Sequence, residues 1–251
     1  MRSALPLLIL AACAGPERPA EDVVYRDGSD GGATSGERGT VKITEILWSG
    51  TVHADGTRDR SDVFLEIRNE SSKPINVSGW RLEIHGGREH GWKLPTTDKA
   101  LQVGDVLIVA AKSTGCFPDA DLVMPELSFP DGDPFSLTLR DADERLIEGV
   151  GSVEQPPFAG GYDLVRSRSM ERVHLMFGGD GDRDPSWHFY AGEPCLPGVV
   201  TDAEDPSTLR CFEQHPNNDR VAPDCRVYTL ASPGRPNSPD YSGAYASGSF
   251  E

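Results

Sequence analysis

The feature that most constrains this chain is a period-two alternation of residue types that begins at residue 41. In 41–48 the odd-numbered residues share one face of an extended segment, and the even-numbered residues share the other. In 62–69, Val63, Leu65 and Ile67 point one way, whereas Phe64, Glu66 and Arg68 point the other. Alternation of this kind is typical of a half-buried β-strand.

Further strands are indicated along the middle of the chain. Residues 80–84 alternate again, and 105–111 form a nearly continuous apolar run, which indicates a central strand covered on both faces. The segments 135–139 and 146–150 flank the polar stretch 141–144, so we expect a hairpin there.

Turn-forming residues separate these segments, since the chain has 27 Gly and 20 Pro in 251 residues. Short strands divided by turn clusters predict an all-β fold, an antiparallel sandwich or barrel. One short helix is expected in 206–215, where Asp205 can cap it and Pro206 suits the first helical position.

The N-terminus carries an export pattern. A charged start at Arg2 is followed by an apolar run from Ala4 to Ala12, which predicts a signal peptide over 1–12. Leu10-Ala11-Ala12-Cys13 resembles the lipobox of bacterial lipoproteins, and this implies a lipid anchor on Cys13. A plain secretory signal and a chance apolar start are the alternatives. We expect an outer-membrane or cell-surface lipoprotein whose residues 13–39 form a disordered tether.

Four further cysteines, in an exported chain, predict disulfides rather than reactive thiols. They are Cys116, Cys195, Cys211 and Cys225, and they permit three pairings. We favour Cys211–Cys225 together with Cys116–Cys195. The formal charge of −16 repels phosphate backbones, so no nucleic-acid partner is expected.

Four phrases, in this order, resemble the lamin-tail domain: 41–46, 64–69, 75–82 and 229–237. The resemblance implies an immunoglobulin-like antiparallel β-sandwich over 40–237, with a disulfide-stapled C-terminal insertion at about 191–228 and a flexible tail at 238–251. Within the phrases, the core motif residues are Glu66, Asn69, Gly79 and Trp80. Gly79 permits a turn that a β-carbon would strain, and Trp80 supplies a large apolar side chain to the core.

The same resemblance implies an interaction module without catalytic residues. We therefore expect a non-catalytic, lipid-anchored cell-envelope protein that binds an envelope protein or a glycan, or that serves a structural role. A protein with such a role requires no cofactor.

One loop suggests a different chemistry. Asp180, Asp182 and Asp184 alternate in a Gly-rich segment, so their carboxylates can converge on one calcium ion. An acidic turn between strands is the simpler interpretation. The alternative function is thus a calcium-dependent carbohydrate-binding protein or envelope hydrolase. Exposure of Trp187, Phe189 and Tyr190 beside the loop favours it, and their burial favours the interaction module.

Overall fold

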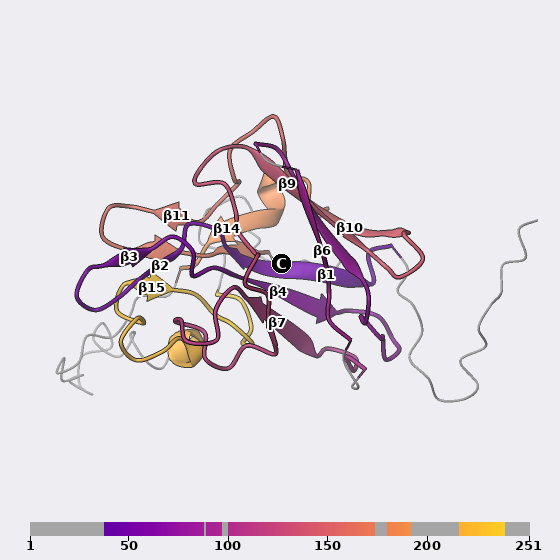
Figure 1. Cartoon of the computed structure of the whole chain (residues 1–251), viewed down its shortest axis with the longest axis horizontal. Helices are drawn as coiled ribbons and strands as arrows, with labels where there is room; N and C mark the ends of the chain where they lie inside the picture. Colours follow the sequence, from indigo (N-terminus) through magenta and orange to yellow (C-terminus); the bar gives the residue numbers. More distant parts are fainter. Residues whose placement is uncertain (1–37, 88, 97–99, 174–179, 192–215, 239–251) are drawn as a thin grey trace, which may run out of the picture.

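The computed structural model describes residues 38–87, 89–96, 100–173, 180–191 and 216–238 (Figure 1). Several predictions fall outside these ranges: the signal peptide, the lipid anchor on Cys13, the helix in 206–215, and the cysteines Cys195 and Cys211. Among the described residues, no helix is both long and apolar enough to cross a bilayer.

Two large sheets form the body. The six-stranded sheet has the order β14 (Trp187–Phe189), β13 (Met170–Arg172), β1 (Val41–Leu47), β4 (Phe64–Asn69), β7 (Val106–Ala110) and β8 (Leu122–Val123). The four-stranded sheet has the order β10 (Leu146–Ser152), β9 (Phe135–Arg140), β5 (Arg81–His85) and β6 (His90–Lys93).

Smaller elements complete the described part of the chain. One small sheet contains β11 (Gly161–Tyr162), β12 (Ser167–Arg168) and β15 (Thr229–Leu230), and another contains β2 (Thr51–Val52) and β3 (Arg58–Asp59). The described residues also contain the 3-10 helices η2 (Asp184–Ser186) and η3 (Pro216–Arg220).

The two large sheets enclose one continuous apolar core. Trp80 and Trp92 from the four-stranded side lie in the same cluster as Ile43, Leu65 and Val109 of the six-stranded sheet. Figure 1 shows β1, β4 and β7 side by side, with β6, β9 and β10 on one side of them. The predicted all-β sandwich is confirmed.

The strand pairing confirms part of the expected detail and corrects the rest. β9 and β10 form the predicted hairpin around 141–144. Most pairs are antiparallel, but β7–β8 and β12–β15 are parallel, so the sandwich is not wholly antiparallel.

A β-bulge interrupts β1 and changes which residues share a face. The register against β4 shifts between Ile43 and Glu45. Because one residue is inserted, Ile43 and Ile46 both reach the central core, although strict alternation puts them on opposite faces. The bulge therefore turns Glu45 away from the central core and towards the other side of the sheet.

That other side is also buried. The apolar run at 105–111 predicted this for β7, but the alternation in 62–69 did not predict it for β4. Leu47, Phe64 and Ile108 form a second apolar cluster with Phe117 and Val221, and the latter belongs to the C-terminal segment 216–238. In Figure 1 this segment, in yellow, lies on the side of β4 and β7 away from the four-stranded sheet. The prediction that 62–69 is only half-buried was therefore wrong, because a late part of the chain covers its second face.

Candidate functional site

Three glutamates form a row across the six-stranded sheet, beneath the C-terminal segment. Glu45 on β1 is the cross-strand partner of Glu171 on β13 and of Glu66 on β4. All three side chains are buried, with exposed fractions of 0%, 0% and 2%. Carboxylates are seldom buried without partners, so the contacts of this glutamate row decide what it can do.

The C-terminal segment supplies most of the hydrogen-bond donors. The backbone N–H of Ser232 donates to Glu45 Oε1 at 2.7 Å, and that of Gly234 donates to Glu66 Oε2 at 2.7 Å. Ser238 reaches Glu171 Oε2 with its backbone N–H, at 3.0 Å, and with its hydroxyl. The segment is thus fastened to the sheet through buried carboxylates.

The remaining oxygens of the glutamate row also have partners. Thr44 Oγ1 donates to Glu66 Oε1 at 2.6 Å, directly at the bulge. Ser232 Oγ lies 3.2 Å from Glu45 Oε2 and also contacts Glu171 Oε1. Each of the six carboxylate oxygens therefore has at least one hydrogen-bonding contact.

The Ser232 hydroxyl favours an arrangement in which one of the two carboxyls that it contacts is uncharged. A serine hydroxyl has a single O–H and can donate to one acceptor at a time. The Ser232 hydroxyl therefore donates to either Glu45 or Glu171. Its contact with the other glutamate is a hydrogen bond only when that glutamate is protonated and donates to Ser232 Oγ. The geometry therefore suits a row in which Glu45 and Glu171 share at least one proton.

The electrostatics of the glutamate row lead to the same conclusion. Burial raises the pKa of Glu171 to about 7, against the lowering effect of the Ser232 and Ser238 donors. Burial, reinforced by the charges of Glu171 and Glu66, raises the pKa of Glu45 well above its ordinary value. Burial also raises the pKa of Glu66. An uncharged carboxyl is favoured because desolvation penalises the ionised form.

Asn237 and Gly234 fix the path of the C-terminal segment over the row. Asn237 Nδ2 donates to the carbonyl oxygens of Thr44 and Arg172, both at 2.9 Å, and so joins β1 to β13 beside the bulge. Gly234 has a φ of 68°, and an added Cβ would lie 3.2 Å from Ile108 Cδ1. A side chain at 234 would therefore be both strained and crowded.

Beside the glutamate row, a buried ion pair joins the two large sheets. Arg172 on β13 contacts Glu148 on β10 at 3.1 Å, and both side chains are 6% exposed. Arg172 Nη1 also donates to the Ile43 carbonyl at 3.3 Å, and its guanidinium lies over the Trp187 ring. Removing one partner would leave a buried charge without compensation, so the pair fixes how the sheets meet at this edge.

The other residues of the sequence motif have structural roles. Asn69 is buried, and its amide donates to the carbonyls of Lys73, Leu101 and Gln102 while its Oδ1 accepts from Ser71. Gly79 has a φ of 74°, as the turn requires, and Trp80 is 1% exposed in the central core. These residues stabilise the turns and the core of the sandwich.

The aspartate loop does not assemble a three-carboxylate site in the described residues. Asp180 Oδ2 lies 3.3 Å from the Arg183 guanidinium, and Asp180, Asp182 and Asp184 do not come together within 4.8 Å of one another. The loop backbone is instead anchored, since Trp187 Nε1 and the Gly151 N–H both donate to the Gly181 carbonyl.

The aromatic residues beside this loop are mostly buried. Trp187 is 4% exposed and Tyr190 is 1% exposed, whereas Phe189 is 54% exposed. Of the three, Phe189 alone fits the carbohydrate-binding alternative. Two of the three residues therefore follow the expectation for an interaction module.

The disulfide differs from both predicted pairings. Cys116, in the loop after β7, is bonded to Cys225 in the C-terminal segment. The predicted pairs Cys211–Cys225 and Cys116–Cys195 are therefore wrong. The physical reason is that the C-terminal segment folds back over β4 and β7, which brings two cysteines 109 residues apart into one apolar cluster.

Two features of the site were missed at the level of sequence. Sequence reasoning named Glu66 but missed Glu45 and Glu171 as its neighbours. Glu45 interrupts the apolar face of Val41, Ile43 and Leu47, and that interruption was the available signal. His53, whose Nδ1 lies 3.6 Å from Cys225 Sγ, gave no signal, because nothing in the sequence places it near either cysteine.

The fold and this site together define an all-β sandwich whose buried acidic row is closed by its own C-terminal segment. No protein-family model matches the sequence, and no curated protein matches it either.

Proposed function

We propose that this chain is a non-catalytic, lipid-anchored protein of the bacterial cell envelope, with a lamin-tail-like sandwich that binds an envelope protein or a glycan or serves a structural role. The observation that carries the proposal is the closed glutamate row. A catalytic carboxylate must reach a substrate proton, whereas these carboxylates are buried and contact donors from the C-terminal segment and from Thr44. Such an arrangement favours a scaffold over an acid–base site.

The arrangement of the lamin-tail-like phrases supports the family resemblance. The phrase 41–46 contributes Glu45, the phrase 64–69 contributes Glu66, and the phrase 229–237 contributes the backbone donors of Ser232 and Gly234. Residues far apart in the chain thus meet at one place. A shared physical role explains why these phrases would occur together in a family.

The cellular part of the proposal rests on the lipobox-like tetrapeptide ending at Cys13. An exported location also suits a chain with a disulfide, because disulfides persist in oxidising compartments. The full chain should therefore incorporate a fatty-acid label in bacterial cells and sediment with membranes. Cys13→Ser should abolish both, and Ala14→Ser, which keeps the cysteine, should change neither.

The non-catalytic part has its own test. The purified Cys13→Ser chain should show no turnover on ester, glycosidic and peptide substrates. Measurable hydrolysis that is lost in Glu171→Gln while the fold is retained would contradict the proposal. Labelling of Cys13→Ser at the level of the unaltered chain would separately contradict the lipid anchor.

A further inference from the structure

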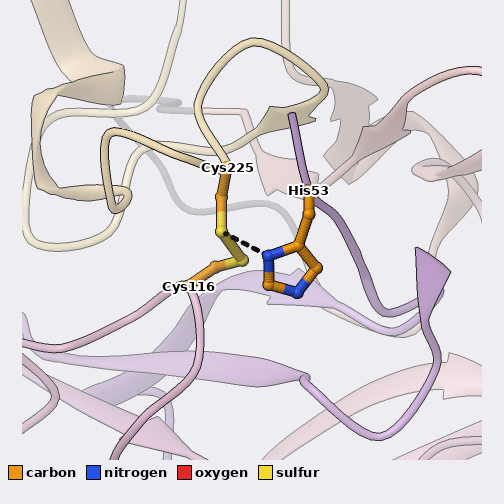
Figure 2. Close-up of side chains that lie close together, drawn as sticks. All are labelled: His53, Cys116 and Cys225. Atoms are coloured by element: carbon orange, nitrogen blue, oxygen red, sulfur yellow. Dashed lines mark hydrogen bonds between the residues drawn. A yellow bond between two sulfur atoms is a disulfide. The ribbon is translucent and has the colours of Figure 1, made fainter. Parts of the chain in front are cut away.

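Three side chains from distant parts of the sequence gather at one edge of the second apolar cluster. His53 follows β2, Cys116 follows β7, and Cys225 lies in the C-terminal segment. One ring nitrogen and the two sulfurs lie within 4.8 Å of one another. Figure 2 shows the imidazole facing the disulfide, with Nδ1 directed at Cys225 Sγ.

We propose that, when the Cys116–Cys225 disulfide is reduced, His53 Nδ1 and the two thiolates form a binding site for a thiolate-preferring metal ion, with Zn²⁺ as the leading occupant. Histidine nitrogen and cysteine sulfur are the donors that Zn²⁺ most often takes in proteins. The proposal adds a ligand site that the envelope-module function does not use.

The distances suit this ion with little rearrangement. With Zn–S near 2.3 Å and Zn–N near 2.0–2.1 Å, tetrahedral coordination puts sulfur and nitrogen about 3.6 Å apart and two sulfurs about 3.8 Å apart. His53 Nδ1 already lies 3.6 Å from Cys225 Sγ. The required change is therefore a separation of the two sulfurs, which reduction itself permits.

Asp224 can supply a fourth donor. Its Oδ2 lies 3.8 Å from His53 Nδ1, and its Oδ1 lies 3.8 Å from Cys225 Sγ. The Asp224 side chain is 72% exposed and that of His53 is 33% exposed, whereas both cysteines are buried. An ion can thus approach from solvent on the Asp224 side and meet the sulfurs from there.

Backbone contacts hold the three segments together independently of the S–S bond. The Ala54 N–H donates to the Asp224 carbonyl at 2.6 Å, which ties the His53 segment to the Cys225 segment. The Ala222 N–H donates to the Cys116 carbonyl at 2.9 Å, which ties the Cys116 segment to the same part of the chain. The ligand atoms should therefore stay close together after the disulfide is opened.

The chemistry balances with one co-reactant. A dithiol reductant transfers two electrons and two protons to the disulfide and becomes a disulfide itself, which leaves two thiols on the protein. Zn²⁺ then displaces both thiol protons as it forms two Zn–S bonds, while neutral His53 donates a lone pair. Bound metal also withholds the thiolates from reoxidation.

The test uses the full chain carrying Cys13→Ser, so that the anchor cysteine does not take part. The reduced protein is titrated with Zn²⁺ against a chromophoric chelator, and the oxidised protein is titrated in parallel. The reduced chain should bind one Zn²⁺ that the oxidised chain does not. His53→Ala should weaken binding at least about tenfold, since even indirect disturbance of a metal ligand costs that much.

Two controls and one spectrum make the outcome decisive. His85→Ala, and Cys195→Ser together with Cys211→Ser, should leave the affinity unchanged. Co²⁺ in place of Zn²⁺ should give thiolate charge-transfer absorption that Cys116→Ser diminishes. The proposal is overturned if His53→Ala and Cys116→Ser bind like the parent, or if the reduced chain, folded or unfolded by circular dichroism, takes up no Zn²⁺ at this site.

Discussion

Replacing Glu171 by glutamine should stabilise this protein at neutral and alkaline pH. The pKa of Glu171 rises from 4.5 to about 7 on folding because the side chain is buried. At about 1.4 kcal/mol per pKa unit, ionising this carboxyl in the folded state costs about 3 kcal/mol. Glutamine is neutral, and its amide can accept from Ser238 and donate to Ser232 Oγ, as a protonated glutamate would.

The sign of the pH dependence follows from the raised pKa. The folded state holds the Glu171 proton more tightly than the unfolded state does, so the stabilisation is complete below pH 4.5 and is lost as the pH rises through about 7. Unfolding of the parent chain should therefore become easier from pH 5 to pH 8. Asp59 and Asp219, whose pKa values are lowered, lose their contribution only in more acidic solution.

Urea unfolding at pH 5 and pH 8, followed by the fluorescence of the buried tryptophans, measures this directly. Glu171→Gln should exceed the parent by about 3 kcal/mol at pH 8 and show a much smaller difference at pH 5. Glu126→Gln, at an exposed carboxylate, is the matched control and should follow the parent. The reasoning is refuted if Glu171→Gln is less stable than the parent at pH 8, or if it keeps the parent's full pH dependence.

Three further perturbations test other parts of the structure. The double substitution Cys116→Ser and Cys225→Ser opens a loop with a sequence separation of 109 residues. In the chain-entropy model this should lower the free energy of unfolding by about 4–5 kcal/mol, which urea titration under non-reducing conditions measures. Asn69→Ala should cost about 2 kcal/mol, because the buried side chain no longer donates to the carbonyls of Lys73, Leu101 and Gln102 or accepts from Ser71. Asn76→Ala, at an exposed position, should cost much less, and equal costs would contradict the role given to Asn69. Melting curves in calcium and in chelator should coincide, since Asp180 is paired with Arg183, and a calcium-dependent rise in Tm that Asp182→Asn removes would contradict that expectation.

The sandwich could be predicted because each of its strands and turns leaves a pattern of residue types within a short stretch of sequence. Alternation in 41–48 and 62–69, the apolar run at 105–111 and the polar turn at 141–144 each report a strand or a turn without knowledge of the rest. The roles of Gly79 and Trp80 could be predicted for the same reason. A glycine just before a strand indicates a turn with positive φ, and a tryptophan beside it indicates a core side chain, and both are found in the structure. The strands and turns all appear at these positions in the structure, although the bulge interrupts the alternation in β1 and the second face of 62–69 is covered.

What could not be predicted depends on contacts between distant segments. The bulge at Thr44 is stabilised by Asn237, which lies 193 residues later in the chain. The residues near Thr44 therefore do not predict the bulge. The second apolar cluster and the Cys116–Cys225 bond both require the C-terminal segment to fold back over β4 and β7. The spacing of the four cysteines left three pairings open, because the lengths of the intervening loops do not determine which sulfurs come together.

The central claim is that buried carboxylates hold the C-terminal segment against the six-stranded sheet. Hydrogen–deuterium exchange of the backbone amides of Ser232, Gly234 and Ser238 tests it most directly, because each of these N–H groups donates to a glutamate of the row. We expect these amides to exchange as slowly as those in the centre of β4, and Glu45→Ala to accelerate Ser232. Rapid exchange of all three in the unaltered protein would contradict the claim.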